Sequence, residues 1–600
     1  MRPRLRFDDA LSLPPRLPGI FLLSLSGLLF QLAATRIASA ALNYHLAFFI
    51  ISAALLGTGA GGAWVAMRRH DVPLWPLAVG SAFGIAAVGA AAFWLPLRLA
   101  DSAAVLMGLI LIYPVLALPF FCQGAAIASL LRAAGRRSGI TYAAVLLGAA
   151  VGVGLSPIVL DVVGPPWTLV VACCASVVAA SSFGLAGRWW LLGALVPCVA
   201  MATIAIQPFA PNVLRTKPLA TLLDPVLFPD AQLLTTTWDS TSRVDVIEAP
   251  GAPLLWGTRG AGLVGLPGGP EARGITIDAD ALTAVLRAEG GESADVVFNL
   301  ATSAPHALAP RERVLVIGSG GGVDVEAALA FGARHVDAVE INRGVVDAML
   351  GPLAVYTGDL YRRMGVSLAV GDGRSFVRRA GRGTAYDAIV LTAVDSWAAI
   401  GAGAYSLTEN YLYTAEAFQE YYDLLAPGGV LAVSRWYTTP PRELARLTQM
   451  AARAIERRGE NPARSLLLIR SGQFGSFGTL LVRKGAFPTQ EVVSARAFVR
   501  AKGFGLAYDP VLNAASFGDL YLDDFPIDAP PARLGLATDD QPFFFAFTRW
   551  GDVFRGRIPY SQLPLGHSVL LVTLIQSAAF ALVVTVLPFR RFRARRRTSG

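Results

Sequence analysis

Seven long apolar stretches in the first third of the chain constrain its fold more than any other feature. Each approaches the roughly 20 residues that an α-helix needs to cross about 30 Å of hydrocarbon. They are residues 18–35, 46–67, 75–97, 104–131, 142–160, 167–185 and 189–206, and an eighth stretch covers residues 568–589. We therefore expect an α-helical transmembrane bundle of about seven helices within residues 1–207, and a C-terminal transmembrane helix with a basic tail within residues 548–600.

The composition agrees with a membrane protein. Apolar residues make up 54% of the chain and charged residues only 16%, against about a quarter charged in soluble proteins. The formal net charge of +9 includes the arginines between residues 590 and 597, which follow the last apolar stretch. Such a run is typical of the cytoplasmic flank of a membrane anchor, so we expect the lipid bilayer as a partner and no nucleic acid.

The apolar stretches also suggest what the bundle does. None of the eight contains an Asp or Glu, the groups that ion-coupled transporters place inside their bundles. Glycines at 57, 59, 61 and 62, and the pair Gly148 and Gly152, predict close helix packing. We expect the bundle to anchor the protein, or to admit a hydrophobic acceptor, rather than to transport ions.

Residues 208–560 have an ordinary soluble composition. Short β-type runs at 243–248 and 274–278 flank a Gly- and Pro-rich stretch from 250 to 270, which predicts a linker and small β region over residues 208–300. Alternating strand and helix patterns then predict an α/β domain over residues 301–547. All four cysteines lie in the apolar first third, so no cysteine zinc site is available in the soluble part and we expect no metal.

A glycine-rich turn opens this α/β region. The apolar run 314–317 leads into glycines at 318, 320, 321 and 322 and then into a helical pattern. This order predicts a helix start that turns unpaired backbone N–H groups toward a polar or anionic ligand. A second apolar run, 336–339, ends at Glu340, where nucleotide-binding folds present an acid to ribose hydroxyls.

The glycine spacing narrows the class of nucleotide. The sixth position from Gly318 is Val323, which departs from the small residue expected for NAD. No Gly-Lys-Ser/Thr follows, so a phosphate loop is excluded. Gly318, Gly320 and Gly322 instead have the spacing common in proteins that bind nucleosides with a sulfonium group.

Two further strand patterns end in acids. Residues 366–370 precede Asp372, and residues 388–391 lead to Asp395. Ligands bind at the carboxyl ends of the strands in open parallel sheets. We therefore expect Gly318, Glu340, Asp372 and Asp395 to converge on one crevice.

On these residues the sequence resembles the spermidine synthase superfamily, and in particular its multi-spanning bacterial membrane branch. The resemblance lies between residues 238 and 547. The matching segments are VLVIGSGGGVD, AVEIN, GDGRSF, YDAIVLTAVDSW, GAYSLTENYLYTAEAF, LAPGGVLAVSRW and TDDQPFFF. The resemblance implies a Rossmann-like parallel sheet of the methyltransferase and spermidine synthase type with a small β lead-in. It also implies S-adenosylmethionine or its decarboxylated form as co-substrate.

The resemblance assigns roles to individual residues. It places the glycine loop and Asp324 near the amino-acid-derived arm of the nucleoside, Glu340 on the ribose and Asp372 near the adenine. It makes Asp395 the catalytic acid that accepts a proton from an amine acceptor or holds that amine.

The chain also departs from the soluble enzymes of this superfamily. Their D-S-S-D-P pattern is replaced by a segment from Thr392 to Ser396, so a threonine stands at the usual base position and only the second acid, Asp395, is kept. Gly321 stands where the acid that binds the arm would be. Phe298-Asn299 align with the Tyr-Gln pair that helps to hold the diamine.

Three functions remain open at this stage. The first is a membrane-anchored aminopropyltransferase that transfers from decarboxylated S-adenosylmethionine to an amine. The second is an S-adenosylmethionine-dependent methyltransferase, because the same fold hosts both reactions. The third is a non-catalytic nucleoside-binding or sensing module, which the missing acids favour.

The location of the soluble region is unresolved by the sequence. Arginines in alternate connections, at 2–6, 68–69, 132–137 and 188, predict a cytoplasmic N-terminus and place the soluble region outside the cytoplasm after seven spans. The expected nucleoside, however, is a cytosolic metabolite. We expect a multi-pass protein of a bacterial inner membrane, with the side of the soluble region and a homo-oligomeric state left open.

Overall fold

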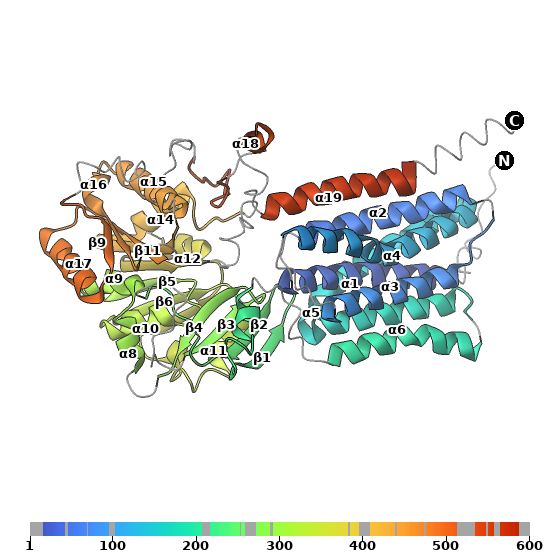
Figure 1. The fold of residues 1–600 in the computed structure, drawn as a ribbon, viewed down its shortest axis with the longest axis horizontal. Coiled ribbons are helices and arrows are strands. Elements are labelled where there is room, and N and C mark those ends of the chain that lie inside the picture. Colours follow the sequence, from blue (N-terminus) through green and yellow to red (C-terminus); the bar gives the residue numbers. More distant parts are fainter. Residues whose placement is uncertain are drawn as a thin grey trace. The chain divides into compact units, whose positions relative to one another are not determined.

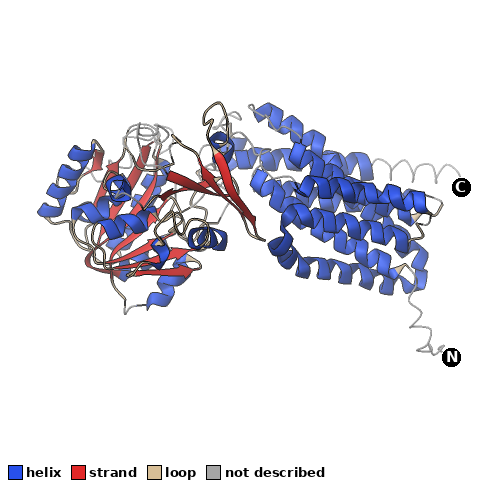
Figure 2. Ribbon diagram, turned by 90° about the horizontal axis from the view of Figure 1, so that it is seen from below, coloured by secondary structure: helices blue, strands red, loops and turns tan. Residues whose placement is uncertain are grey.

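The computed structural model describes most of the 600-residue chain. The described ranges are 16–41, 46–68, 70–94, 102–185, 187–206, 217–252, 254–258, 272–288, 292–381, 384–394, 409–438, 441–472, 476–512, 535–547, 550–556 and 565–586. They form two compact units. One contains residues 1–220, 237–243 and 567–600, and the other contains residues 221–236 and 244–566. Figure 1 shows the fold and Figure 2 its secondary structure.

The first unit consists of long apolar helices that pack side by side (Figure 1). They are α1 (Leu17–Ala41), α2 (Leu46–Met67), α3 (Leu74–Trp94), α4 (Ser102–Ala134), α5 (Ser138–Ser182), α6 (Arg188–Ile206) and α19 (Leu565–Ala581). Within the described ranges, four helical segments are long and apolar enough to cross a membrane by length and composition. The fourth runs from Ile110 to Ser182 and so includes most of both α4 and α5.

Helix α5 differs from the expected pattern. The stretches 142–160 and 167–185 were expected to form two separate spans, but the structure places nearly all of both on one helix that is interrupted at Gly164. Gly164 has φ 77° and ψ 165°, a conformation that glycine adopts readily and other residues rarely do. Pro165 and Pro166 follow it, and prolines are tolerated there because the first turn of a helix does not use its N–H groups.

Glycines allow close contact between these helices. A Cβ on Gly61 would lie 2.1 Å from the carbonyl oxygen of Phe121, and a Cβ on Gly148 would lie 2.2 Å from that of Phe21. A side chain at either position would collide with backbone that cannot yield. The packing role predicted for these two glycines is confirmed, whereas Gly59 has nothing within 4 Å of the same point.

The second unit begins with a four-stranded sheet. Its order is β1 (Gln232–Trp238), β2 (Arg243–Glu248), β3 (Ala272–Ile277) and β4 (Ala281–Leu286). Strands β2, β3 and β4 pair antiparallel. The small β region expected before the α/β core is therefore present.

An eight-stranded sheet forms the centre of this unit. Its order is β12-β10-β11-β9-β8-β5-β6-β7. The strands are β5 (Arg313–Ile317), β6 (His335–Glu340), β7 (Val366–Val370), β8 (Tyr386–Thr392), β9 (Leu425–Tyr437), β10 (Leu466–Arg470), β11 (Ser476–Arg483) and β12 (Gly505–Tyr508). Strands β5 to β9 are parallel, as expected. Strand β11 is antiparallel to β9 and β10, which makes the whole sheet mixed rather than purely parallel.

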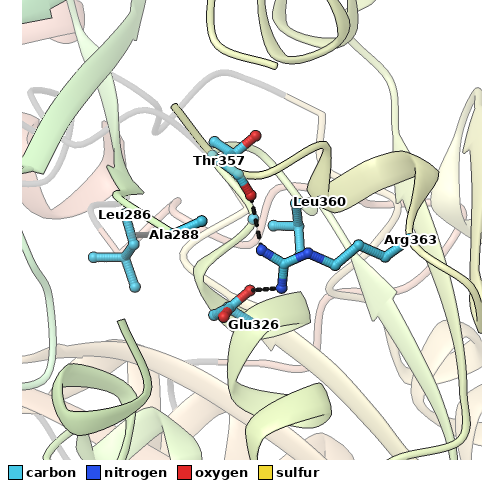
Figure 3. A pocket seen from close by; sticks show the side chains of 8 residues that line it. Leu286, Ala288, Glu326, Thr357, Leu360 and Arg363 are labelled. Atoms are coloured by element: carbon cyan, nitrogen blue, oxygen red, sulfur yellow. Dashed lines mark hydrogen bonds and ion pairs between the residues drawn. The ribbon is translucent and has the colours of Figure 1, made fainter. Parts of the chain in front are cut away.

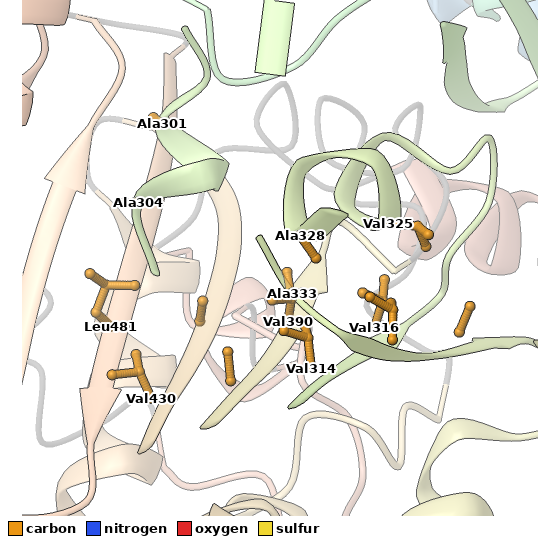
Figure 4. Packing of buried hydrophobic residues seen from close by; sticks show 14 of the residues in the cluster. Ala301, Ala304, Val314, Val316, Val325, Ala328, Ala333, Val390, Val430 and Leu481 are labelled. Atoms are coloured by element: carbon orange, nitrogen blue, oxygen red, sulfur yellow. The ribbon is translucent and has the colours of Figure 1, made fainter. Parts of the chain in front are cut away.

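Helices cover both faces of this sheet. Successive side chains of its central strands therefore point alternately into two hydrophobic cores, one on each face. Val314 and Val316 of β5 pack with α10 (Val323–Ala330), α11 (Arg343–Leu350) and α17 (Thr489–Lys502), and part of this core is shown in Figure 4. Leu315 and Ile317 pack on the other face, with α12 (Gly373–Ala380), α14 (Ala415–Leu424) and α15 (Arg442–Glu456). This burial on both faces explains the continuous apolar runs of these strands.

Strand β5 lies at the point where the strand order reverses. From β5 the chain passes to β6 and β7 on one side and then to β8 and β9 on the other. In open α/β sheets, the crevice at the carboxyl end of such a reversal is the usual ligand site. The loop that leaves β5 there is the glycine-rich segment from Gly318 to Gly322.

Candidate nucleoside site

The glycine loop adopts a backbone that requires glycine at three positions. Gly318, Gly320 and Gly322 have φ angles of 70°, 52° and 84°, in the left-handed region that residues with a Cβ rarely adopt. Gly322 is the N-cap of α10. The same three glycines that define the sequence motif are therefore those that shape the turn.

All five N–H groups from Gly318 to Gly322 donate hydrogen bonds within the protein. Those of Gly318 and Ser319 donate to the carbonyl oxygen of Val339, and that of Gly322 donates to the carbonyl oxygen of Ser319. The Gly320 N–H donates to Glu340 at 2.9 Å, and the Gly321 N–H donates to Thr283 Oγ1 at 3.1 Å. The expectation that these loop N–H groups are unpaired and face a ligand is wrong.

Strand β4 closes over the loop at Gly321. A Cβ at this position would lie 2.0 Å from the carbonyl oxygen of Ala284 and 3.0 Å from Val285 Cγ2. The position where the soluble enzymes of the resembled superfamily carry an acid is therefore filled by backbone of the small sheet. The neighbouring Thr283 is the residue that accepts the Gly321 N–H, and nothing in the local sequence pattern indicated it.

A buried tyrosine, Tyr361, contacts the glycine loop through its hydroxyl group. The Tyr361 hydroxyl donates to the Gly320 carbonyl oxygen, 2.7 Å away, and lies 2.9 Å from Ser319 Oγ. Burial raises the pKa of this hydroxyl, so it remains a donor at physiological pH. Tyr361 was also not predicted, because it lies in the connection between α11 and β7, about 40 residues from the loop.

Glu340 ends β6 directly beside the loop. Its side chain is only 5% exposed. One carboxylate oxygen accepts the Gly320 N–H and the other accepts the Asn342 N–H at 2.8 Å. Burial raises the pKa of Glu340, and the hydrogen bonds from Asn342, Gly320 and Ile341 oppose that rise.

Polar and apolar groups flank Glu340 at neighbouring strand ends. Asp372 follows β7 and caps α12, where its carboxylate accepts the Ser375 N–H at 2.7 Å. Two apolar side chains at these ends stay open to solvent: Ile341 is 68% exposed and Val370 is 53% exposed. An acid and exposed apolar surface together suit the edge and faces of a flat heterocycle.

Asp324 occupies the first turn of α10 and is partly buried. Burial raises the pKa of its carboxyl group to about 6, and the nearby Thr392 hydroxyl opposes that rise. The hydroxyl oxygen of Thr392 is itself buried and makes no hydrogen bond within 3.5 Å. The end of β8 also contacts the glycine loop, because a Cβ on Gly318 would lie 2.5 Å from Val394.

The remaining site predictions have different outcomes. Asp395, predicted to be catalytic, lies outside the described residues. Phe298 packs edge-on against Phe331, just beyond the far end of α10 from the loop, with ring centroids 4.8 Å apart. Asn299 accepts a hydrogen bond from Lys502 at 2.9 Å. The structure therefore does not bring Phe298-Asn299 to the glycine loop.

An ion-pair cluster connects the late TDDQPFFF segment to helices α12 and α14. Arg374 is 3% exposed and contacts both carboxylate oxygens of Asp539, at 2.5 and 2.7 Å. It also contacts both carboxylate oxygens of Glu420, at 2.9 and 3.1 Å. Two motifs that are far apart in the sequence, GDGRSF and TDDQPFFF, therefore bind each other through Arg374 and Asp539.

A small pocket lies beside the glycine loop, between Gly321, Gly322 and the side chain of Arg363. Figure 3 shows the Arg363 guanidinium between Glu326 and the carbonyl group of Thr357, with hydrogen bonds of 2.8 Å to each. Leu286, Ala288, Gly321, Gly322 and Leu360 complete its lining. Its volume of about 10 Å³ accommodates about one water molecule. It is therefore not a nucleoside site. Across the described ranges, no group of three or more His, Cys, Asp or Glu is placed to hold a metal ion.

Solved structures show a distant likeness to this fold. A spermidine synthase from Thermotoga maritima is 17% identical over 44% of this chain and 78% of its own, with a TM-score of 0.30. A spermidine synthase in complex with the transition-state analogue AdoDATO is 17% identical over 48% of this chain and 84% of its own, with a TM-score of 0.29. A candidate methyltransferase from Escherichia coli is 16% identical over 34% of this chain and 93% of its own, with a TM-score of 0.21.

No family model matches the chain. No curated protein matches it either. The strand order of the large sheet is Rossmann-like, with an antiparallel strand at β11. That arrangement is the α/β fold of the spermidine synthase and methyltransferase type.

Proposed function

We propose that this chain is a membrane-anchored, spermidine synthase-like transferase that uses decarboxylated S-adenosylmethionine and passes its aminopropyl group to an amine. One observation carries the proposal. A buried carboxylate, Glu340, stands at the carboxyl end of β6, next to a glycine loop at the reversal of strand order. This is the position from which a carboxylate binds the two hydroxyls of a ribose.

The geometry of Glu340 suits a ribose. Each carboxylate oxygen offers about two acceptor positions, and the backbone N–H groups of Gly320, Asn342 and Ile341 point at this carboxylate. The acceptor capacity that these groups leave over can serve a ribose hydroxyl. The loop backbone holds the carboxylate in place, so little side-chain entropy is lost when the nucleoside binds.

The adenine would lie toward β7. Ile341 and Val370 offer it apolar surface, since both are more than half exposed without a ligand. Asp372 adds an acceptor for the exocyclic amino group at the N-terminus of α12.

The reaction itself needs positioning and proton acceptance. The acceptor nitrogen forms a bond to the propyl carbon next to the sulfonium sulfur while the bond from that carbon to sulfur breaks. The electron pair of the broken bond neutralises the sulfur and gives methylthioadenosine, and the surplus proton of the amine passes to a carboxylate. We assign that carboxylate to Asp395. In-line positioning and exclusion of water supply much of the rate.

Methyl transfer from S-adenosylmethionine is the second candidate. It is favoured by Thr392, which supplies a hydroxyl at the usual base position, and by Gly321, which has no room for an acid. Many methyl acceptors need no second carboxylate, whereas an amine that arrives as an ammonium ion must lose a proton.

We also propose that the apolar unit spans a bilayer in several passes. Four described segments are long and apolar enough for this. Within the bundle, buried polar side chains bond one another, as is typical of helices that associate in lipid. Ser26 Oγ lies 2.8 Å from Ser176 Oγ, and Gln123 donates to Ser81 at 3.0 Å. A bilayer location gives the enzyme access to a hydrophobic amine acceptor.

Product analysis tests the proposed reaction. The full chain, purified in detergent, is incubated with decarboxylated S-adenosylmethionine and a panel of diamines, polyamines and aminolipids. We expect methylthioadenosine to be released in amounts equal to an aminopropylated product. Release of S-adenosylhomocysteine from S-adenosylmethionine, with no methylthioadenosine, would identify a methyltransferase. Tight nucleoside binding without either product would identify a binding module.

A further inference from the structure

One end of the helical bundle is held together by an arginine. Arg132, in the last turn of α4, donates hydrogen bonds of 3.0, 3.0 and 3.1 Å to three carbonyl groups in and just after the last turn of α2, those of Val65, Arg68 and His70. Helix α5 begins at this same end, because only the 3-10 turn η2 (Gly135–Arg137) separates it from α4. The ends of α2 and α4 and the start of α5 therefore lie together.

This end of the bundle carries a surplus of positive charge. Arg68, Arg136 and Arg137 are exposed here. The acid of the same connections, Asp71, lies 3.7 Å from Arg132. By sequence, residues 68–73 and 132–138 contain this one acid against arginines at 68, 69, 132, 136 and 137. Such a surface favours an anionic partner.

Aromatic rings lie within two helical turns of this charged end. Trp64 is in the last turn of α2, and the Arg68 guanidinium lies 4.6 Å from its ring centroid. Trp75 and Trp190 are in the first turns of α3 and α6, and their ring centroids are 5.2 Å apart. Trp190 is 62% exposed, and Tyr142 near the start of α5 is 50% exposed. Such rings are enriched where membrane hydrocarbon meets the lipid headgroups, so this end of the bundle suits headgroup depth.

An exposed apolar face continues from the arginines along α5. Ile140, Leu146 and Leu147, which follow η2 in the first three turns of this helix, are 53%, 52% and 60% exposed. The opposite face of α5 packs on α1, where a Cβ on Gly148 would lie 2.2 Å from the Phe21 carbonyl oxygen. Positive charge and apolar surface therefore follow each other directly on the outer side of the bundle. This order matches the headgroup and the acyl chains of a phospholipid.

We propose that this end of the bundle binds an anionic phospholipid, with Arg136 and Arg137 at its phosphate and the exposed face of α5 along its acyl chains. The inference rests on the proposed bilayer location of the apolar unit, and not on the proposed reaction. An arginine guanidinium presents a planar fork of donors that matches a phosphate in two parallel, charge-assisted hydrogen bonds. A zwitterionic headgroup carries its own cation near the phosphate, and that cation weakens the attraction.

The apolar face beside the arginines indicates where the phosphate comes from. A free phosphate would use the arginines alone and leave that face of α5 uncovered, whereas a phospholipid covers both. Arg132 is a poor candidate for the headgroup contact, because its guanidinium already binds the carbonyl groups at the end of α2. An arginine close to an anionic lipid surface contributes about fivefold to affinity, so Arg136 and Arg137 together should contribute at least about tenfold.

Lipid binding to the full chain in a non-ionic detergent tests the proposal. The protein is titrated with phosphatidylglycerol and with phosphatidylcholine of the same acyl chains, and native mass spectrometry gives the dissociation constant of the first bound lipid. The variants are Arg136→Gln/Arg137→Gln and the control Arg457→Gln/Arg500→Gln, which removes two exposed arginines from the second unit. We expect the wild type to bind phosphatidylglycerol at least about tenfold more tightly than phosphatidylcholine. The first variant should lose at least about tenfold of the phosphatidylglycerol affinity and the control less than about twofold, with phosphatidylcholine affinity unchanged in both.

Each other outcome overturns the inference. Equal affinities of the wild type for the two lipids would refute it without any variant. An equal loss in the control would show that only the total charge of the protein matters. If inorganic phosphate binds the wild type as tightly as phosphatidylglycerol does, the arginines bind a free anion and not a lipid. If neither lipid binds, the proposed bilayer location fails as well, which distinguishes the two failures.

Discussion

Replacing Gly321 by alanine tests whether the small sheet truly closes over the glycine loop. The added Cβ would lie 2.0 Å from the Ala284 carbonyl oxygen and 2.8 Å from its carbonyl carbon. A normal contact needs more than 3 Å, so either β4 or the loop must move by about 1 Å. The obstacle is backbone and not a flexible side chain, so the strain cannot be relieved by a change of rotamer.

The cost follows from two contributions. Overpacking of a well-filled interior costs about 1 to 3 kcal/mol. The movement also breaks or lengthens the hydrogen bond from the Gly321 N–H to Thr283, which adds about 1 kcal/mol. We expect Gly321→Ala to lower the unfolding free energy by about 2 to 4 kcal/mol. For a unit of this size that lowers the melting temperature by roughly 5 °C or more.

Thermal unfolding of the full chain in detergent measures this effect. The matched control is Gly551→Ala in α18 (Trp550–Phe554), because nothing lies within 4 Å of a Cβ at that position. The control should unfold within about 1 °C of the wild type. If Gly321→Ala unfolds as late as the control, then β4 does not occupy the place of the missing acid.

Three further predictions follow from the site and the bundle. Asp395→Asn should lower turnover by about a hundredfold or more with little change in nucleoside affinity, and equal turnover would exclude Asp395 as the proton acceptor. Arg374→Gln should destabilise the second unit by about 2 to 4 kcal/mol, because it removes the buried cation between Asp539 and Glu420 and leaves them only the more exposed Arg378; an unchanged melting temperature would contradict this. Vesicles that contain the reconstituted protein should show no proton- or sodium-driven uptake of polyamines, because the eight apolar stretches contain no acid and Asp161, which the structure places within α5, lies next to the interruption of that helix at Gly164; uptake that collapses with the ion gradient would refute that expectation.

The strand ends of the site could be predicted from the sequence. Parallel strands that are buried on both faces read as short apolar runs, and the runs at 314–317, 336–339, 366–370 and 388–391 lie within β5, β6, β7 and β8. The residue after such a run lies at the carboxyl edge of the sheet. For that reason the sequence pattern predicts Glu340 beside the glycine loop.

The contacts that decide the chemistry of the site could not be predicted in this way. Thr283 and Tyr361 reach the loop from about 40 residues away in opposite directions along the chain. Neither lies in a motif, because a single hydroxyl on a strand or in a loop has no periodic signal. The pairing of the loop N–H groups depends on these distant residues and on Glu340, so a local pattern wrongly indicated free donors. Arg374 and Asp539 are 165 residues apart in the sequence, so no local sequence pattern predicts their contact.

A double-mutant cycle can test whether Glu340 holds the ribose of a bound nucleoside. Dissociation constants of methylthioadenosine and of its 2′,3′-dideoxy analogue are measured for the wild type and for Glu340→Ala. We expect Glu340→Ala to weaken binding of methylthioadenosine by about 1.5 to 3 kcal/mol and to leave binding of the dideoxy analogue nearly unchanged. Equal losses for the two ligands, or unchanged affinity for methylthioadenosine in the folded variant, would contradict the claim.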